Sequence, residues 1–339
     1  MSAPSAELLG EGTVPSGILV LVDAGLLGLW DRSAEGFPAT ADFRVDGADA
    51  DEAGRRFGRT WHPRYRYDVP ADRAGDAVAE FAAFAADEHL DAALVELPGG
   101  VDHRRRIDLA LEQGGGRFGI LEFFGVRAPV IAGVPTDAHF TVAGVRMREP
   151  ELADRWRWVG IQLGEGEHAR SETVGEVFVD EARLMLADAD ALLEWCHEDS
   201  LDGLADFVFW GLDAGRAAAA HGAQALEGGE LGWLDLPVVE AAQRGLAVEE
   251  SREREGWAFA TDFRPHSHHY EALRQMRASP NGAGTVVVGG AKMCAFLTSW
   301  GDGAFPVSVE LDGDDRLVRL LIDLGNDETV ARLRQPPPS

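Results

Sequence analysis

The sequence predicts an α+β protein built on antiparallel sheet, in two related β-rich halves with helices at their periphery. Three observations lead to this class. Short apolar runs bounded by turn residues recur along the 339 residues, segments with helical spacing lie between them, and one aspartate-containing pattern occurs twice. An apolar content of 45% with 9 tryptophans further indicates a packed core.

The first half, residues 1–150, contains three predicted strands and one clear helix. We expect residues 1–14 to be frayed, like the tail at 335–339. The strands are short apolar runs that end in turn residues, at 18–22, 94–97 and 118–124. The helix is 76–90, where Val78, Phe81, Ala82 and Ala85 recur at helical spacing. Residues 40–115 carry no functional motif.

The second half, residues 151–330, follows a linker predicted at 147–155, where charges and Pro150 interrupt the pattern. Segments 156–163 and 174–179 are predicted to be extended, and helices are predicted at 187–195, 214–221 and 237–244. The charged run 249–256 indicates a loop or a solvated face. Residues 270–278 have helical spacing, but the Pro280-Asn281-Gly282 turn and the valines after it favour a hairpin there.

One pattern occurs in both halves. Val22-Asp23 is followed by Asp31, and Val179-Asp180 is followed by Asp188 at the same spacing. A strand-like run precedes each pair, so the sequence predicts a duplication that pairs Asp23 with Asp180. Chance resemblance between common strand–Asp–turn units is the open alternative.

The most distinctive motif is Trp300-Gly301-Asp302-Gly303, followed by Phe305. The two glycines allow positive φ, so the aspartate is expected on a tight turn, which can bind a ligand or only reverse the chain. The candidate ligand or partner surface is Trp300, Gly301, Asp302, Gly303, Phe305, Asp180 and Asp188. Its aspartates could offer oxygen ligands to Ca²⁺ or Mg²⁺, whereas a structural aspartate would accept N–H bonds within its own turn. The two aromatic residues could likewise form an exposed patch or pack against the turn.

This motif resembles a bacterial family known only as a domain of unknown function, family 4241. Residues 299–306 match its C-terminal hallmark, Ser-Gly-Trp-Gly-Asp-Gly-x-Tyr-Pro, and Asp323-Leu324 matches the Asp-Phe that closes its last hairpin. The family's upstream Val-Asp element is matched by Val179, Asp180 and Asp188. The resemblance covers residues 174–190 and 290–324 and departs from the family pattern at Glu181, Ala182, Thr298 and Leu324. It implies a C-terminal β-unit and no established activity.

A second candidate site lies at 262–269. If this segment is extended, alternation places Asp262, Arg264, His266 and His268 on one face. Asp262, His266 and His268 are then a candidate set of ligands for a divalent metal. The guanidinium of Arg264 opposes a cation, so a packed or surface histidine cluster is the competing interpretation. No other cofactor is predicted.

The formal net charge of -27 argues against nucleic acid and membrane as partners and favours a basic protein. An acidic surface that only maintains solubility is the simpler alternative. Cys196 and Cys294 lack the spacing of a zinc or redox motif. The N-terminus does not resemble a signal peptide, and no apolar run reaches membrane-spanning length, so we expect a cytoplasmic protein.

The favoured function is a cytoplasmic binding or interaction protein without catalytic activity, of an immunity or regulatory type. The sequence contains no nucleophile elbow, phosphate loop or dinucleotide fingerprint. The alternative is a metal-dependent hydrolase that uses Asp262, His266 and His268.

Overall fold

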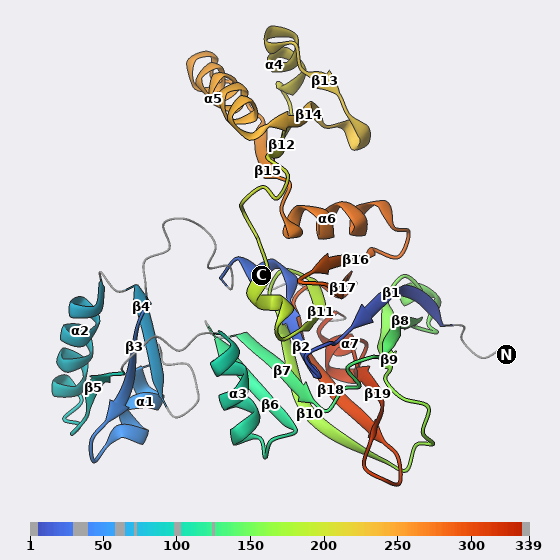
Figure 1. Ribbon diagram of the computed structural model, residues 1–339. Coiled ribbons are helices and arrows are strands. Elements are labelled where there is room, and N and C mark those ends of the chain that lie inside the picture. Colours follow the sequence, from blue (N-terminus) through green and yellow to red (C-terminus); the bar gives the residue numbers. More distant parts are fainter. Residues whose placement is uncertain are drawn as a thin grey trace. The chain divides into compact units, whose positions relative to one another are not determined.

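The computed structural model describes residues 6–29, 40–57, 65–70, 73–97, 103–123 and 126–333. Within them there are seven α-helices and 19 strands, and the strands form four antiparallel sheets (Figure 1). The predicted class, a β-rich α+β protein with antiparallel sheets, is confirmed. The chain divides into two compact units, which we call unit 1 (Met1–Trp195 with Gln275–Ser339) and unit 2 (Cys196–Arg274).

The body of unit 1 is two six-stranded sheets. The order of the first sheet is β1-β8-β9-β19-β18-β10, and that of the second is β16-β17-β11-β2-β7-β6. The strands of the first sheet are β1 (Glu7–Thr13), β8 (His139–Arg146), β9 (Trp156–Gln162), β19 (Leu317–Ile322), β18 (Gly303–Leu311) and β10 (Arg170–Val179). Those of the second are β16 (Ala283–Val288), β17 (Ala291–Leu297), β11 (Arg183–Asp188), β2 (Ile18–Asp23), β7 (Val126–Ala132) and β6 (Phe118–Phe123).

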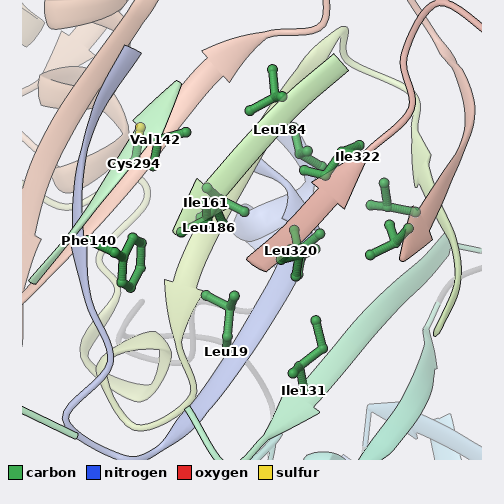
Figure 2. Close-up of a cluster of buried hydrophobic side chains, with 14 of the residues drawn as sticks. Leu19, Ile131, Phe140, Val142, Ile161, Leu184, Leu186, Cys294, Leu320 and Ile322 are labelled. Carbon is green, nitrogen blue, oxygen red and sulfur yellow. The ribbon is translucent and has the colours of Figure 1, made fainter. Parts of the chain in front are cut away.

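Both sheets contribute side chains to one buried core. Figure 2 shows Leu19, Ile131 and Leu184 from the second sheet close to Ile161 and Leu320 from the first. In β18 the buried positions alternate with partly exposed ones, as expected for a strand with one face on a core. β2 is buried at every position, which explains its uninterrupted apolar sequence.

The order of each sheet is mirrored about its centre. From the centre of the first sheet, the strands run β9, β8, β1 on one side and β19, β18, β10 on the other. From the centre of the second, they run β2, β7, β6 and β11, β17, β16. In these two sheets, each strand from β1 to β9 therefore lies at a position mirrored by a strand from β10 to β19.

Two smaller sheets are each interleaved with helices. The first module contains β3 (Thr40–Asp46), α1 (Ala50–Phe57), β4 (Arg66–Pro70), α2 (Ala74–Asp87) and β5 (Ala93–Glu96), with strand order β4-β3-β5. The second module, in unit 2, contains β12 (Leu204–Trp210), α4 (Ala214–His221), β13 (Gln224–Ala225), η5 (Glu227–Gly229), β14 (Leu231–Pro237), α5 (Val238–Glu255) and β15 (Ala260–Pro265), with order β13-β14-β12-β15. Phe207, Phe209, Trp233 and Val248 form much of its core.

The remaining elements connect these parts. α3 (His103–Gln113) precedes β6, and α6 (His268–Ala278) precedes β16. Short 3₁₀ helices follow β2 (η1, Ala24–Leu29), β8 (η3, Pro150–Leu152) and β11 (η4, Ala191–Glu194), and α7 (Asp327–Leu333) follows β19. None of the helices described combines the length and the apolarity needed to cross a bilayer.

Most of the predicted elements are confirmed. Strands β2, β5, β6, β9 and β10 and helices α2 and α4 lie where the sequence places them, and Pro237 caps the start of α5. On α2, Phe81 and Ala85 are buried as the spacing predicts, and Ala77 is buried with them, whereas Val78 and Ala82 are exposed. Asp31 and residues 335–339 lie outside the described residues.

Three local predictions are wrong, and a fourth is right only in part. Residues 7–13, expected to be frayed, form β1 because their backbone pairs with β8. The charged run 249–256 is not a loop, because it lies almost wholly in α5, but it is the solvated face that the sequence indicates, with Glu250, Glu253 and Glu255 exposed. Residues 270–278 belong to α6, and the valine strand pairs instead with the following strand, β17. The helix predicted at 187–195 does not form, because β11 continues to Asp188 and only the 3₁₀ helix η4 (Ala191–Glu194) follows it.

The predicted division into residues 1–150 and 151–330 does not coincide with the two compact units. Residues 147–155 connect β8 to β9, which pair with each other, and the backbone N–H of Met147 donates to the carbonyl of Arg155. The segment is therefore the end of a hairpin inside unit 1 and not a linker between compact units.

Candidate functional site

The Trp300 turn is tied to its own sheet. The Trp300 indole Nε1–H donates to the Trp156 carbonyl at 2.7 Å, and the Trp156 backbone N–H donates to Ser299 Oγ at 2.8 Å. Phe305 is fully buried, and Trp300 packs against the core of unit 1. The two aromatic residues thus pack and do not form an exposed patch. Gly301, at φ 76°, turns the chain, and Gly303 begins β18.

Two of the three aspartates of this candidate surface, Asp302 and Asp188, accept backbone N–H groups. Asp302 Oδ1 accepts the N–H of Ala182 at 3.1 Å. The buried Asp188 carboxylate accepts the N–H of Ser16 at 2.8 Å and those of two residues in its own turn. The backbone N–H of Asp180 donates to Asp23, while the Asp180 side chain is on an exposed residue. These contacts fix turns.

The predicted metal set Asp262, His266 and His268 is not assembled. The Asp262 carboxylate accepts a hydrogen bond from Arg264 Nε at 2.6 Å, and His268 Nδ1 accepts the backbone N–H of Cys196 at 3.0 Å. Arg264 also donates two bonds to Glu230, at 2.9 and 2.7 Å. Each of these side chains therefore has a different set of partners, and only His266 remains a candidate.

His266 lies with Asp206 and Asp235 in the second module. Of the residues described, these three are the one group of potential metal ligands whose donor atoms all lie within 4.8 Å of one another. Asp206 is in β12, Asp235 is in β14, and His266 directly follows β15. β12 pairs with both other strands, and the His266 backbone N–H donates to the Leu204 carbonyl at 3.1 Å. Sheet register thus brings the three side chains to one end of the module.

Further hydrogen bonds orient this group. His266 Nδ1 lies 3.0 Å from Asp202 Oδ2, and His266 Nε2 lies 3.2 Å from Asp206 Oδ1. The Tyr270 hydroxyl donates to Asp206 Oδ2 at 2.7 Å, and the Tyr270 ring stacks on the imidazole at 4.6 Å between centroids. The Asp235 backbone N–H donates to Asp206 Oδ1 at 2.9 Å. Both ring nitrogens and the buried carboxylate therefore have defined partners.

The electrostatics follow from this arrangement. Partial burial acts to lower the pKa of His266, but hydrogen bonds to Asp202 and Asp206 and the charges of both carboxylates outweigh it and raise the pKa. The hydrogen bond from His266 lowers the pKa of Asp202. Burial, followed by the bond to Asp206, raises the pKa of the Tyr270 hydroxyl. An imidazole between carboxylates can hold a proton or give its Nε2 lone pair to a cation.

No protein-family model matches the chain, and comparisons with curated proteins and with solved structures found no match either.

Sequence reasoning selected His266 but missed Asp206, Asp235, Asp202 and Tyr270. Asp206 had a signal: it is a lone carboxylate inside an apolar strand, and a buried charge requires partners. Asp235 had none, because its proximity to His266 depends on the pairing of β12 with β14 and β15.

Proposed function

We propose that this protein is a non-catalytic interaction protein that binds a basic partner through unit 2. The proposal rests on the distribution of exposed apolar side chains. More than half of the exposed large apolar residues described belong to unit 2, although it is the smaller unit. They are Leu201, Trp210, Leu212, Leu234, Val239, Leu246 and Phe263. Scattered exposed apolar residues are ordinary, but a concentration of them is typical of a contact surface.

The outer face of α5 is the most continuous part of this surface. Val239 and Leu246 are 68% and 65% exposed, and their spacing places them on one face of the helix, with exposed Ala242 between them. We call these three residues the α5 strip. The opposite face, with Ala241, Gly245 and Val248, is buried in the core of the second module. Burial within the module therefore does not explain the apolar strip.

Charge selects the kind of partner. The chain carries a formal net charge of -27, and the exposed acidic residues Glu250 and Glu253 of α5 follow the strip along the same helix. A protein with an apolar groove bordered by arginine or lysine would match both features, in the manner of an amphipathic helix docking into a groove. An immunity-type or regulatory protein that neutralises a basic protein would need such complementarity.

We further propose that the chain consists of two related halves, in which Asp23 is equivalent to Asp188. The sequence instead predicts that Asp23 is equivalent to Asp180. Asp23 ends β2 and Asp188 ends β11, and a 3₁₀ helix follows each strand. Each carboxylate accepts the N–H of the residue two positions later, Gly25 or Asp190. The mirrored strand orders of both large sheets are what this register requires.

Irregular features support the same register. β1 shifts its pairing between Leu8 and Gly10, and β10 shifts between Thr173 and Gly175. Gly175 lies as far after Gly10 along the chain as Asp188 lies after Asp23. A β-bulge interrupts the regular pairing of two strands and is usually retained among related proteins. Two bulges at matching positions therefore favour common origin over chance.

The two modules also match each other. In the first, the Asp49 N–H donates to the Asp91 carbonyl at 3.0 Å and the Asp91 N–H donates to the Asp49 carboxylate at 2.8 Å. In the second, Asp213 makes both bonds with Ala258, each at 3.1 Å. Two residues before each aspartate stands a glycine with positive φ, Gly47 or Gly211, where a Cβ would collide with the facing backbone.

The resemblance to domain-of-unknown-function family 4241 stays a prediction and brings no activity of its own. The alternative function, a metal-dependent hydrolase, also stays a prediction. Its histidine would be His266 with Asp206 and Asp235, since Asp262 and His268 have other partners.

The interaction function is tested with a double variant of the α5 strip, Val239→Asp with Leu246→Asp, in the full chain. The matched control is Val287→Asp, because Val287 is similarly exposed, at 61%, on β16 of unit 1. Affinity capture from cells that make the protein, followed by quantitative mass spectrometry, should enrich a basic protein with the wild type and the control. The double variant should reduce that enrichment at least tenfold, and salt should weaken it.

A captured protein that the double variant retains would contradict the proposal, as would a partner whose binding is insensitive to salt. Circular dichroism of all three proteins checks that the substitutions leave the fold intact.

A further inference from the structure

We propose that Asp206, Asp235 and His266 bind one divalent transition-metal ion in unit 2. The inference stands on the geometry of the second module and does not require a protein partner or a hydrolytic activity. His266 Nε2 lies 3.2 Å from Asp206 Oδ1 and 3.8 Å from Asp235 Oδ1. Donors that each lie about 2.0–2.2 Å from a common ion are separated by about 3.0–3.5 Å in octahedral or tetrahedral geometry. The three atoms therefore need only small adjustments to share an ion.

Exposure of the three side chains suits an ion that exchanges with solvent. The Asp206 and His266 side chains are 3% and 12% exposed, whereas that of Asp235 is 74% exposed. The two buried donors give a fixed base, and the open side next to Asp235 provides a path of entry. It also leaves coordination positions for water, as in sites with only three protein ligands.

The second layer of contacts is that of a metal-binding histidine. A histidine that binds metal through one ring nitrogen usually donates the other N–H to a carboxylate, which fixes the ring and its tautomer. His266 Nδ1 has such a partner in Asp202 Oδ2, at 3.0 Å. The Tyr270 hydroxyl occupies Asp206 Oδ2, so the oxygen on the side of His266 Nε2 is Oδ1, which also accepts the Asp235 backbone N–H. Stacking of Tyr270 on the imidazole further limits rotation of the ring.

The first module provides an internal comparison, which rests on the proposed relation between the halves. Pairing of Phe43 with Glu96 corresponds to pairing of Phe207 with Phe263, and it aligns Asp42 with Asp206. The same alignment places Gly99 in the sequence position of His266. One carboxylate position is therefore common to both modules, whereas the imidazole is particular to the second.

The donor set selects the class of metal. One imidazole nitrogen with two carboxylate oxygens suits Zn²⁺, Mn²⁺ or Fe²⁺. Ca²⁺ and Mg²⁺ prefer sites made of oxygen ligands alone. The neighbouring guanidinium does not oppose the ion strongly, since Arg264 is neutralised by Asp262 and Glu230.

The experiment measures metal binding by the purified full chain. The protein is stripped with a chelator, titrated with ZnCl₂ or MnCl₂ by calorimetry, and assayed for retained metal after dialysis. We expect one ion per wild-type chain and at least a tenfold weaker affinity for His266→Gln and for Asp235→Asn. Asp202→Asn should weaken the affinity about 10–100-fold, as loss of an outer-layer partner does.

The control is His268→Gln, which alters a neighbouring residue outside the proposed ligands and should keep wild-type affinity. Because Asp235 is mostly exposed, Asp235→Asn is expected to fold even if His266→Gln does not. Absence of stoichiometric metal in the wild type overturns the proposal. So does retention of the wild-type affinity by Asp235→Asn, or a loss confined to His268→Gln.

Discussion

Asp23, the last residue of β2, binds the backbone just before β11, and Asp188, the last residue of β11, binds the backbone just before β2. Asp23 Oδ2 accepts the backbone N–H groups of Asp180 and Glu181, which lie just before β11. Asp188 Oδ2 accepts the N–H of Ser16, just before β2, at 2.8 Å. β2 and β11 are neighbours at the centre of the second sheet of unit 1. The two buried carboxylates therefore hold the central strand pair at both ends.

Replacement of either aspartate should weaken the whole of unit 1. Asp23→Ala or Asp188→Ala leaves partly buried N–H groups without their acceptor, and we expect each substitution to cost about 1–3 kcal/mol in all. We expect a corresponding decrease in the free energy of unfolding, measured by urea denaturation. Asp180→Ala is the control, because Asp180 contributes only its backbone N–H to the contact, and its effect should stay within about 0.5 kcal/mol. Equal effects of Asp23→Ala and Asp180→Ala would contradict this role.

The mirrored sheets predict how two fragments of the chain behave. Cleavage between β9 and β10, in the segment 163–169, leaves three strands of each large sheet in either fragment. Each fragment alone would expose β2 or β11 and β9 or β19 as unpaired edges, which favours aggregation or self-association. Co-expressed fragments should assemble into a soluble complex with the circular dichroism of the intact protein. Two fragments that each remain monomeric and folded would contradict the predicted interdependence.

The fold was predictable wherever local pattern and tertiary pairing agree. The run Ile18–Val22 predicts β2 correctly because a strand buried on both faces needs an uninterrupted apolar sequence. β1 was missed because its sequence, ELLGEGT, holds two glycines and few apolar residues. Its pairing with β8 and the burial of Leu9 hold it in place. The Pro280-Asn281-Gly282 turn ends a helix here, although the same residues are equally typical of a hairpin.

A repeated Val-Asp pattern was visible in the sequence, but the register that we propose for the two halves was not. Val-Asp occurs at both 22–23 and 179–180, whereas Asp188 follows an alanine. The hydrogen bonds of Asp23 and Asp188 are the observation that favours the proposed register. The candidate metal group had the same difficulty. Its histidine is recognisable in a histidine-rich segment, but its two aspartates come from strands whose neighbours the sequence does not specify.

Asp302 is expected to act on stability and not on binding. Its carboxylate accepts the N–H of Ala182, which has a positive φ of 53° just before β11. Asp302→Ala should therefore lower the free energy of unfolding by about 1 kcal/mol, the usual net value of one hydrogen bond. Metal affinity of unit 2 and capture of a partner should match those of the wild type. If Asp302→Ala keeps its stability but loses metal binding or partner binding, Asp302 has a functional role and the prediction is wrong.

Cys294 gives a prediction about pH. The thiol is fully buried in the core of unit 1, and this burial raises its pKa to about 12. In the unfolded chain a cysteine ionises near pH 8.5. Because the folded state keeps the proton to higher pH, the stabilising contribution is complete below about pH 8 and is lost as pH rises from there towards 12. The slope that this one group adds is at most about 1.4 kcal/mol per pH unit.

Two measurements test this behaviour of Cys294. Urea unfolding from pH 7 to 10 should show a steeper loss of stability in the wild type than in Cys294→Ala, in which the titrating thiol is removed while other groups still titrate. At pH 8, an aromatic disulfide reagent should modify Cys294 quickly in urea and slowly in the folded protein, at a rate set by opening of the core, since only the thiolate reacts. Modification of the folded protein at the rate of a small free thiol would contradict the burial of Cys294 between the two sheets.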